Sequence, residues 1–186
     1  MFTAFLGWEW STIPGGANLH RIVITDADAQ RAQSFLPFGS NDSPFPDDLW
    51  AWLEKTEHIS GAHFVAIPHN SNISRGTMFS HETMRGDPIT RDYAELRMRW
   101  EPIVEITQIK GDSETHPDLS PDDRFADFET YPWWILRDRV NRYEATKADF
   151  IRSALRTGME MQREVGANPF QFGVIGSTDS HTGLAS

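Results

Sequence analysis

The sequence predicts an α/β fold with a largely parallel, buried sheet, because short apolar segments alternate with amphipathic ones along the chain. Five segments are rich in Val, Ile, Phe or Trp and are bounded by Gly, Pro, Asn or Asp, as β-strands commonly are. These strands are expected at residues 2–10, 19–25, 63–68, 103–109 and 172–177. Three helices are expected between them, at residues 47–58, 91–100 and 147–165.

Start and stop signals support the helices. The first follows Pro46 with acidic residues in its first turn, which favours the positive end of the helix dipole. The third places apolar residues from Ile151 to Met159 along one stripe, until Gly166 ends it. Each helix is therefore expected to cover the sheet with one apolar face.

One connection breaks the alternation. Residues 11–18 are too few for a parallel crossover and are rich in turn formers, so the first two strands are expected to form an antiparallel hairpin. A turn centred between Pro14 and Gly15 makes Glu9 and His20 cross-strand neighbours, since their numbers sum to 29. An unpaired carboxylate is costly in an apolar strand. Glu9 is therefore expected to pair with His20 or with a metal ion.

The charge balance limits the partners of the chain. It has 17 Lys and Arg against 27 Asp and Glu, a net charge of -10, which repels nucleic acid and anionic lipid. No apolar run approaches the ~20 residues of a membrane span, and residues 1–10 do not resemble a signal peptide. Seven acids and Arg124 make residues 111–130 an expected solvated loop. The partner expected is a small molecule rather than a nucleic acid or a membrane, and the compartment and oligomeric state stay open.

Potential metal ligands lie at the ends of three strands. Asp179 and His181 follow the last one, and side chains two residues apart in an extended chain point the same way. His69 follows another strand, and Glu9 and His20 belong to the hairpin. Taken singly, Asp179 and His181 are also explained as a capping Asp beside a loop histidine, and His69 as a loop histidine bonded to backbone. Because the chain has no Cys, such a set suits Mn²⁺, Zn²⁺ or Fe²⁺ in a hydrolytic centre.

Two further candidates are cations. Lys110 follows the strand at 103–109 and is expected to hold an anionic substrate, with Glu114 orienting it. The alternative is an exposed lysine beside a loop carboxylate. Arg21 is a candidate anion contact, although strand alternation points it away from His20.

Several ordered motifs resemble a known family. They are Gly-Trp-Glu-Trp-Ser, Asn-Leu-His-Arg, Pro-His-Asn-Ser-Asn, the segment 105–114, and Gly-Ser-Thr-Asp-Ser-His-Thr-Gly. In them the chain resembles the bacterial domain of unknown function 3604 family, related to the PHP (polymerase and histidinol phosphatase) metal-dependent hydrolases. The resemblance implies a partial, distorted β/α barrel related to the TIM barrel, with two or three metal ions in an intact parent. It also implies the ligands Glu9, His20, His69, Asp179 and His181.

The same resemblance implies the reaction. Its relatives hydrolyse phosphate esters, and some members of the branch are thought to act on sulfate esters. The expected activity is therefore metal-dependent hydrolysis of a small anionic ester, with Lys110 neutralising it and with Asn70, Asn72 and Arg21 contacting it. An amidohydrolase-like barrel acting on a C–N bond and a degenerate, non-catalytic binding domain are the alternatives.

One departure from the family bears on completeness. PHP proteins begin with a His-x-His motif on the first barrel strand, and this chain contains no His-x-His. Residues 1–186 are therefore expected to be one partial domain, a fragment whose catalysis on its own is impaired.

Overall fold

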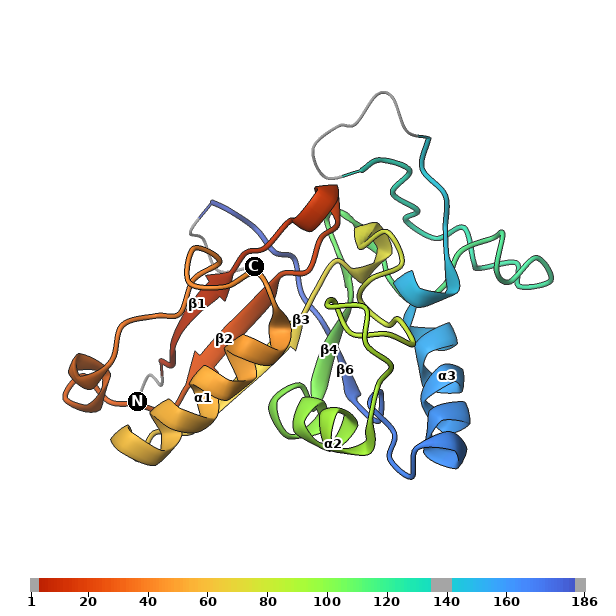
Figure 1. The fold of residues 1–186 in the computed structure, drawn as a ribbon. Helices are drawn as coiled ribbons and strands as arrows, with labels where there is room; N and C mark the ends of the chain where they lie inside the picture. Colours follow the sequence, from red (N-terminus) through yellow and green to blue (C-terminus); the bar gives the residue numbers. More distant parts are fainter. Residues whose placement is uncertain (1–3, 135–141, 183–186) are drawn as a thin grey trace.

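The computed structural model describes residues 4–134 and 142–182, which form a mixed α/β structure of two small sheets and three helices. The expected strand residues 2 and 3 and Gly183 of the last motif lie outside these ranges. The elements, in chain order, are β1 (Leu6–Trp10), β2 (Arg21–Thr25), α1 (Pro46–Ser60), β3 (Phe64–Pro68), α2 (Arg91–Trp100), β4 (Ile103–Gln108), β5 (Gly111–Asp112), α3 (Ile151–Glu164) and β6 (Gly173–Gly176) (Figure 1).

The expected largely parallel sheet is wrong. One sheet has the order β1-β2-β3 with both pairs antiparallel, and the other has the order β5-β4-β6. Only β4 and β6 pair in parallel among the described strands, with α3 in the connection between them. The antiparallel β2–β3 pair arises because the connection containing α1 is a long hairpin. It closes where Asp26 N–H donates to His63 O and His63 N–H donates to Asp26 Oδ1.

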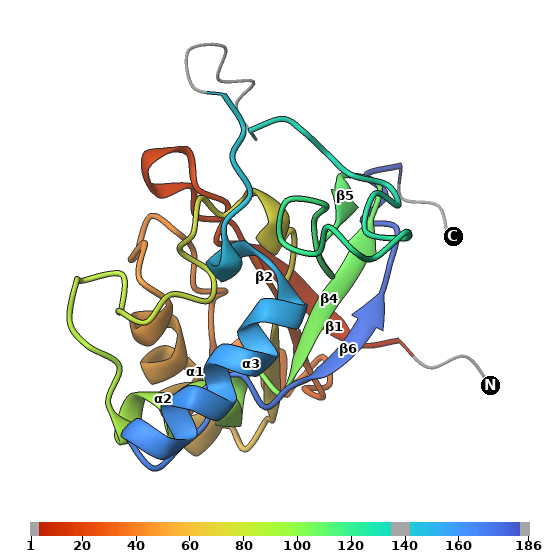
Figure 2. The same ribbon diagram turned by 90° about the vertical axis from the view of Figure 1, so that its right-hand side faces the viewer.

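The described residues show no closed barrel. β3 lies against β4, so the two sheets meet along that line, while β1 and β6 each pair on one side only (Figures 1 and 2). The strands β1 and β3 run in one direction and β2 in the other. The carboxyl ends of β1 and β3 therefore lie at the same edge of their sheet as the start of β2.

Two cores hold the sheets and helices together. Leu49, Trp50 and Leu53 of α1 pack with Val23 and Ala66 of the first sheet. The second core joins α3 to β4 and includes Val104, Ile151, Ala154, Met161 and Phe170 (Figure 2). Since side chains alternate along a strand, residues next to Val23 and Ala66 point to the face of the first sheet that α1 does not cover.

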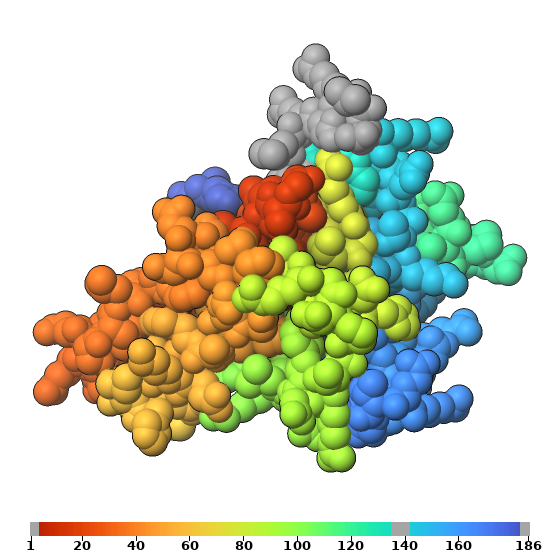
Figure 3. Space-filling view, viewed as in Figure 1, coloured from red at the N-terminus to blue at the C-terminus, as the bar shows by residue number. Residues whose placement is uncertain are grey.

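The segment between α1 and α2 is tied to α1 at the surface. Residues 74–90 adjoin α1 in the space-filling view (Figure 3). Arg85 forms ion pairs with Asp47 and Asp48 at 3.0 and 2.8 Å. No helix in the described parts of the chain has the length and apolar character to cross a bilayer. The acidic segment 111–130 is loop as expected, except that Gly111–Asp112 forms β5 beside β4.

Candidate functional site

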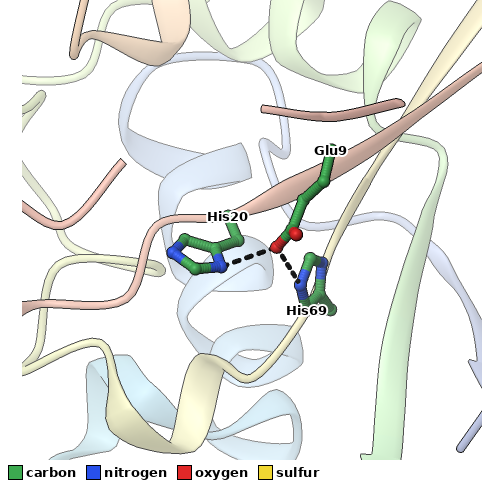
Figure 4. Close-up of side chains that lie close together, drawn as sticks. All are labelled: Glu9, His20 and His69. Atoms are coloured by element: carbon green, nitrogen blue, oxygen red, sulfur yellow. Dashed lines mark hydrogen bonds and ion pairs between the residues drawn. The ribbon is translucent and has the colours of Figure 1, made fainter. Parts of the chain in front are cut away.

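Glu9, His20 and His69 converge on the sheet face that α1 leaves uncovered. Glu9 Oε1 lies 2.7 Å from His20 Nδ1 and 3.1 Å from His69 Nε2 (Figure 4). One ligand atom from each residue lies within 4.8 Å of the other two. The residues come from β1, from the position before β2 and from the position after β3, so three chain segments must be in place to form the cluster.

The hairpin register differs from the expected one by two residues. Glu9 lies opposite Ile22 and Trp10 opposite Arg21, so paired numbers sum to 31 rather than 29. A shift of two keeps every side chain on its face, because the side-chain period of a strand is two. His20 is therefore the diagonal neighbour of Glu9, and the predicted contact between them is confirmed.

Hydrogen bonds hold His69 in place after β3. His69 N–H donates to His20 O at 3.4 Å, and Asn18 Nδ2 donates to His69 O at 2.8 Å. The His69 side chain is 3% exposed and that of His20 is 13% exposed. Both rings are therefore largely buried, and the surrounding atoms leave them little freedom to rotate.

The electrostatics favour a cation at this cluster. Hydrogen bonds with His20 and then His69 hold the pKa of the Glu9 carboxyl far below its ordinary value, against the opposing effect of burial. Two other buried nitrogens, His20 Nε2 and His69 Nδ1, have no hydrogen-bond partner among the described residues. A carboxylate with two imidazoles fits the preferences of Zn²⁺, Mn²⁺ and Fe²⁺.

Asp179 lies in a second group with Lys110 and Gln108. Lys110 Nζ forms an ion pair with Asp179 Oδ2, and Gln108 Nε2 donates to the same oxygen at 2.6 Å. Burial alone would raise the pKa of Asp179, but hydrogen bonds from Lys110 and Gln108 outweigh it and hold the pKa below its usual value. The charge of His69 acts in the same direction, which places the two groups within electrostatic range.

The expected convergence of Asp179 and His181 fails. Asp179 has a φ of 49°, in the left-handed region, so the chain there is not extended and the two-residue alternation does not apply. His181 is exposed and lies outside the Glu9 cluster. Metal binding by Asp179 and His181 stays a prediction.

Glu105 joins the two groups and was not among the predicted site residues. It is 5% exposed, and its Oε2 accepts the backbone N–H of Asn70 at 3.2 Å. Burial is the main cause that raises its pKa, while the charge of His69 lowers it and that of Asp179 raises it. The signal for it was available, because a carboxylate inside an apolar strand is the same pattern that singled out Glu9.

Two expected roles of charged residues are wrong. Arg21 is 1% exposed, and its Nε donates to Glu101 Oε1 at 2.8 Å. It therefore belongs to a buried ion pair and is not a substrate contact. Glu114 pairs with Arg152 at 2.6 Å on the surface, and the partner of Lys110 is Asp179 instead. Both side chains pair with a residue distant in sequence, which the local patterns do not specify.

The two asparagines after His69 differ. The side-chain amide of Asn72 is already hydrogen-bonded within the protein, since its Nδ2 donates to Lys110 O at 3.0 Å and its Oδ1 accepts from Ser113 Oγ at 3.0 Å. The buried side-chain amide of Asn70 has no partner among the described residues. Asn70 is therefore the one of the two whose amide is available to a ligand, and Asn72 instead fixes the backbone of Lys110.

Comparison with known proteins identifies the family alone. The chain matches no curated protein and no solved structure. The model of the family described as "Protein of unknown function (DUF3604)" matches residues 1–186. Since that match spans all 186 residues, the chain belongs to this family.

Proposed function

We propose that this protein is the metal-binding part of a hydrolase of phosphate or sulfate esters, related to the PHP metal-dependent hydrolases. The observation that carries the proposal is the cluster of Glu9, His20 and His69, which brings a carboxylate and two imidazoles within reach of one cation. The Lys110–Asp179 pair supports it, because Asp179, which interacts electrostatically with His69, holds Lys110 in an ion pair.

Each of these residues has a role that follows from its chemistry. Glu9, His20 and His69 would hold a divalent cation, and such an ion would supply a nucleophile at neutral pH by lowering the pKa of water. Lys110 neutralises the non-bridging oxygens of the ester, and Asp179 and Gln108 restrain the lysine. The unpartnered Asn70 amide donates a hydrogen bond to the same oxygens.

Metal uptake tests the first half of this proposal. Chelator-treated protein is titrated with Mn²⁺ and with Zn²⁺ by calorimetry, and the same is done for Glu9→Gln and His69→Ala. Each substitution is expected to weaken binding by at least about tenfold, as loss of metal-site residues commonly does. His63→Ala is the matched control, since His63 also pairs with a glutamate, Glu57 at 2.6 Å, but is 74% exposed.

Turnover tests the second half. The metal-loaded protein is assayed with nitrophenyl phosphate, the bis-ester and nitrophenyl sulfate. Hydrolysis that disappears in both His69→Ala and Lys110→Ala supports an esterase. Metal uptake without turnover of any ester supports a non-catalytic binding domain instead, and activity on amides supports the amidohydrolase alternative. Circular dichroism of each variant distinguishes lost chemistry from lost folding.

A further inference from the structure

A pocket of about 600 Å³ lies beyond the carboxyl ends of β4 and β6. Its lining includes Thr107, Gln108, Glu129, Tyr131, Ser177 and Thr178. The segment 111–130 was expected to be a solvated loop without chemistry, yet its last residues form one wall of this pocket. The pocket is therefore built by the strand ends on one side and by the returning loop on the other.

The loop wall is held in a defined position. Asp112 N–H donates to Glu129 O at 3.1 Å, which ties the end of the loop to β5. Gly111 has a φ of 101°, and a Cβ at this glycine would lie 2.4 Å from Tyr131 Cβ, so Tyr131 packs directly on the glycine backbone. Glu129 itself has a φ of 47°. A non-glycine residue in the left-handed region persists where its surroundings impose it, and such residues cluster at ligand sites.

Gln108 connects the pocket to the Lys110–Asp179 pair. It lines the pocket and is 4% exposed. Its Oε1 accepts Lys110 N–H at 3.0 Å, while its Nε2 donates to Asp179 Oδ2 at 2.6 Å. Gln108 therefore separates the pocket from the Lys110–Asp179 pair, to which the proposed function assigns the ester.

The lining selects the chemistry of that ligand. Five of the nine lining residues, Tyr131 among them, carry a hydroxyl group, and the others include the Gln108 amide, the Glu129 carboxylate and the apolar side chain of Ile109. Thr107 Oγ1 is buried without a hydrogen-bond partner among the described residues. No Lys or Arg of the described chain lines the pocket, so it offers no charge complement to an anion. Hydroxyl donors and acceptors, a carboxylate that accepts from paired hydroxyls and an aromatic face suit a neutral, hydroxyl-rich ring.

We propose that this pocket binds a sugar, and that the ester hydrolysed next to it is a sugar phosphate or sugar sulfate. The sugar-binding part stands on the pocket alone, whereas the ester part rests on the proposed function. In that reaction water attacks phosphorus or sulfur and forms a new bond to it, while the bond to the sugar oxygen breaks. A proton released by the water passes to the sugar oxygen, which leaves as a hydroxyl held by the pocket, and the phosphoryl or sulfuryl group leaves as inorganic phosphate or sulfate.

Binding of free sugars tests the pocket without requiring catalysis. Saturation-transfer NMR is recorded with glucose, galactose, fucose and N-acetylglucosamine, on the whole protein and in the presence of a metal chelator. At least one of these sugars is expected to bind. Its affinity is expected to fall by about tenfold or more in Glu129→Gln and in Thr107→Val, the loss expected for one or two hydrogen bonds.

The control and the opposing outcomes are distinct. Glu164→Gln changes an exposed carboxylate on α3 and is expected to leave sugar binding unchanged. Absence of binding by all four sugars overturns the proposal, and so does binding that persists in both pocket variants. Because the measurement is made without metal, failure of metal uptake leaves its result intact, and the two proposals fail separately.

Discussion

Asn70 combines two unusual features at one position. Its φ of 50° lies in the left-handed region, and its buried amide has no hydrogen-bond partner among the described residues. Its backbone, by contrast, is fully used, since its N–H donates to Glu105 and its carbonyl accepts from Asn18. The residue therefore contributes little to stability through its side chain, which is what a ligand-contacting group requires.

Substitution of Asn70 separates the backbone from the side chain. Asn70→Gly is expected to be more stable than Asn70→Ala by about 1 kcal/mol, because only glycine adopts a left-handed conformation without a Cβ penalty. Urea unfolding measures the difference. At Ala94, inside α2, the order of stability is expected to be reversed, with Ala94→Gly less stable than the wild type. A more stable Asn70→Ala would contradict the left-handed assignment.

At the scale of elements, a buried ion pair joins β2, α1 and α2. Glu101, at the end of α2, accepts from Arg21 Nε at 2.8 Å and from Trp50 Nε1 at 2.9 Å. Arg97 Nε lies 3.1 Å from the second carboxylate oxygen. Arg21 directly follows His20, so this ion pair anchors the start of β2 next to the cluster of Glu9, His20 and His69.

Removing the charge of Glu101 leaves two arginines uncompensated in the core. Glu101→Gln is expected to lower the free energy of unfolding by about 3–5 kcal/mol, the usual cost of breaking a buried pair. Glu160→Gln breaks an exposed pair with Arg156 and is expected to change it by less than about 0.5 kcal/mol. Denaturant unfolding of both variants measures this contrast, and similar losses in the two would contradict it.

Glu101 is also expected to contribute to the fall of the unfolding free energy in acid. Burial alone would raise the pKa of Glu101, but the charges of Arg21 and Arg97 hold it below its ordinary 4.5. Its stabilising contribution is therefore complete above about pH 4.5 and is lost as the pH falls through the lower, folded-state pKa. Unfolding measured over a pH series is expected to give a shallower acid slope for Glu101→Gln than for the wild type. Parallel slopes would show that Glu101 does not contribute.

At the scale of the whole molecule, two strands have uncovered edges. β1 pairs only with β2 and β6 only with β4 in the described structure. Val174 and Ile175 of β6 are 53% and 45% exposed, and Leu6 of β1 is 46% exposed. Apolar strand edges of this kind pair with other chains, although the net charge of -10 opposes association.

Self-association through β6 is the expected consequence. Replacing both Val174 and Ile175 by Lys is expected to reduce the associated fraction at a given concentration, with a change in unfolding free energy within about 0.5 kcal/mol, as for other surface substitutions. Sedimentation velocity over a concentration series measures it. Leu36→Lys is the control, because Leu36 is 86% exposed but lies outside any strand. A wild-type protein that stays monomeric throughout would contradict the expectation.

Local patterns in the sequence determined the elements and one contact of the site. The alternation of short apolar segments with amphipathic ones predicted α2 at residues 91–100, as found, and the turn formers that bound the apolar segments predicted β3, β4 and β6 to within one or two residues. A short turn joins β1 to β2, so a local argument also predicted the Glu9–His20 contact. These features depend on residues close in sequence, whose geometry follows from backbone periodicity and turn length.

Only the tertiary structure decided the direction of β3 and the partners of the charged residues. A helix between two strands is compatible with a crossover or with a long hairpin, and the bonds between Asp26 and His63 select the hairpin. Asp179 pairs with Lys110, 69 residues away, and Arg21 with Glu101, 80 residues away. No local pattern specifies such partners, because they are selected by which groups the packed elements bury together and by the cost of leaving a buried charge unpaired.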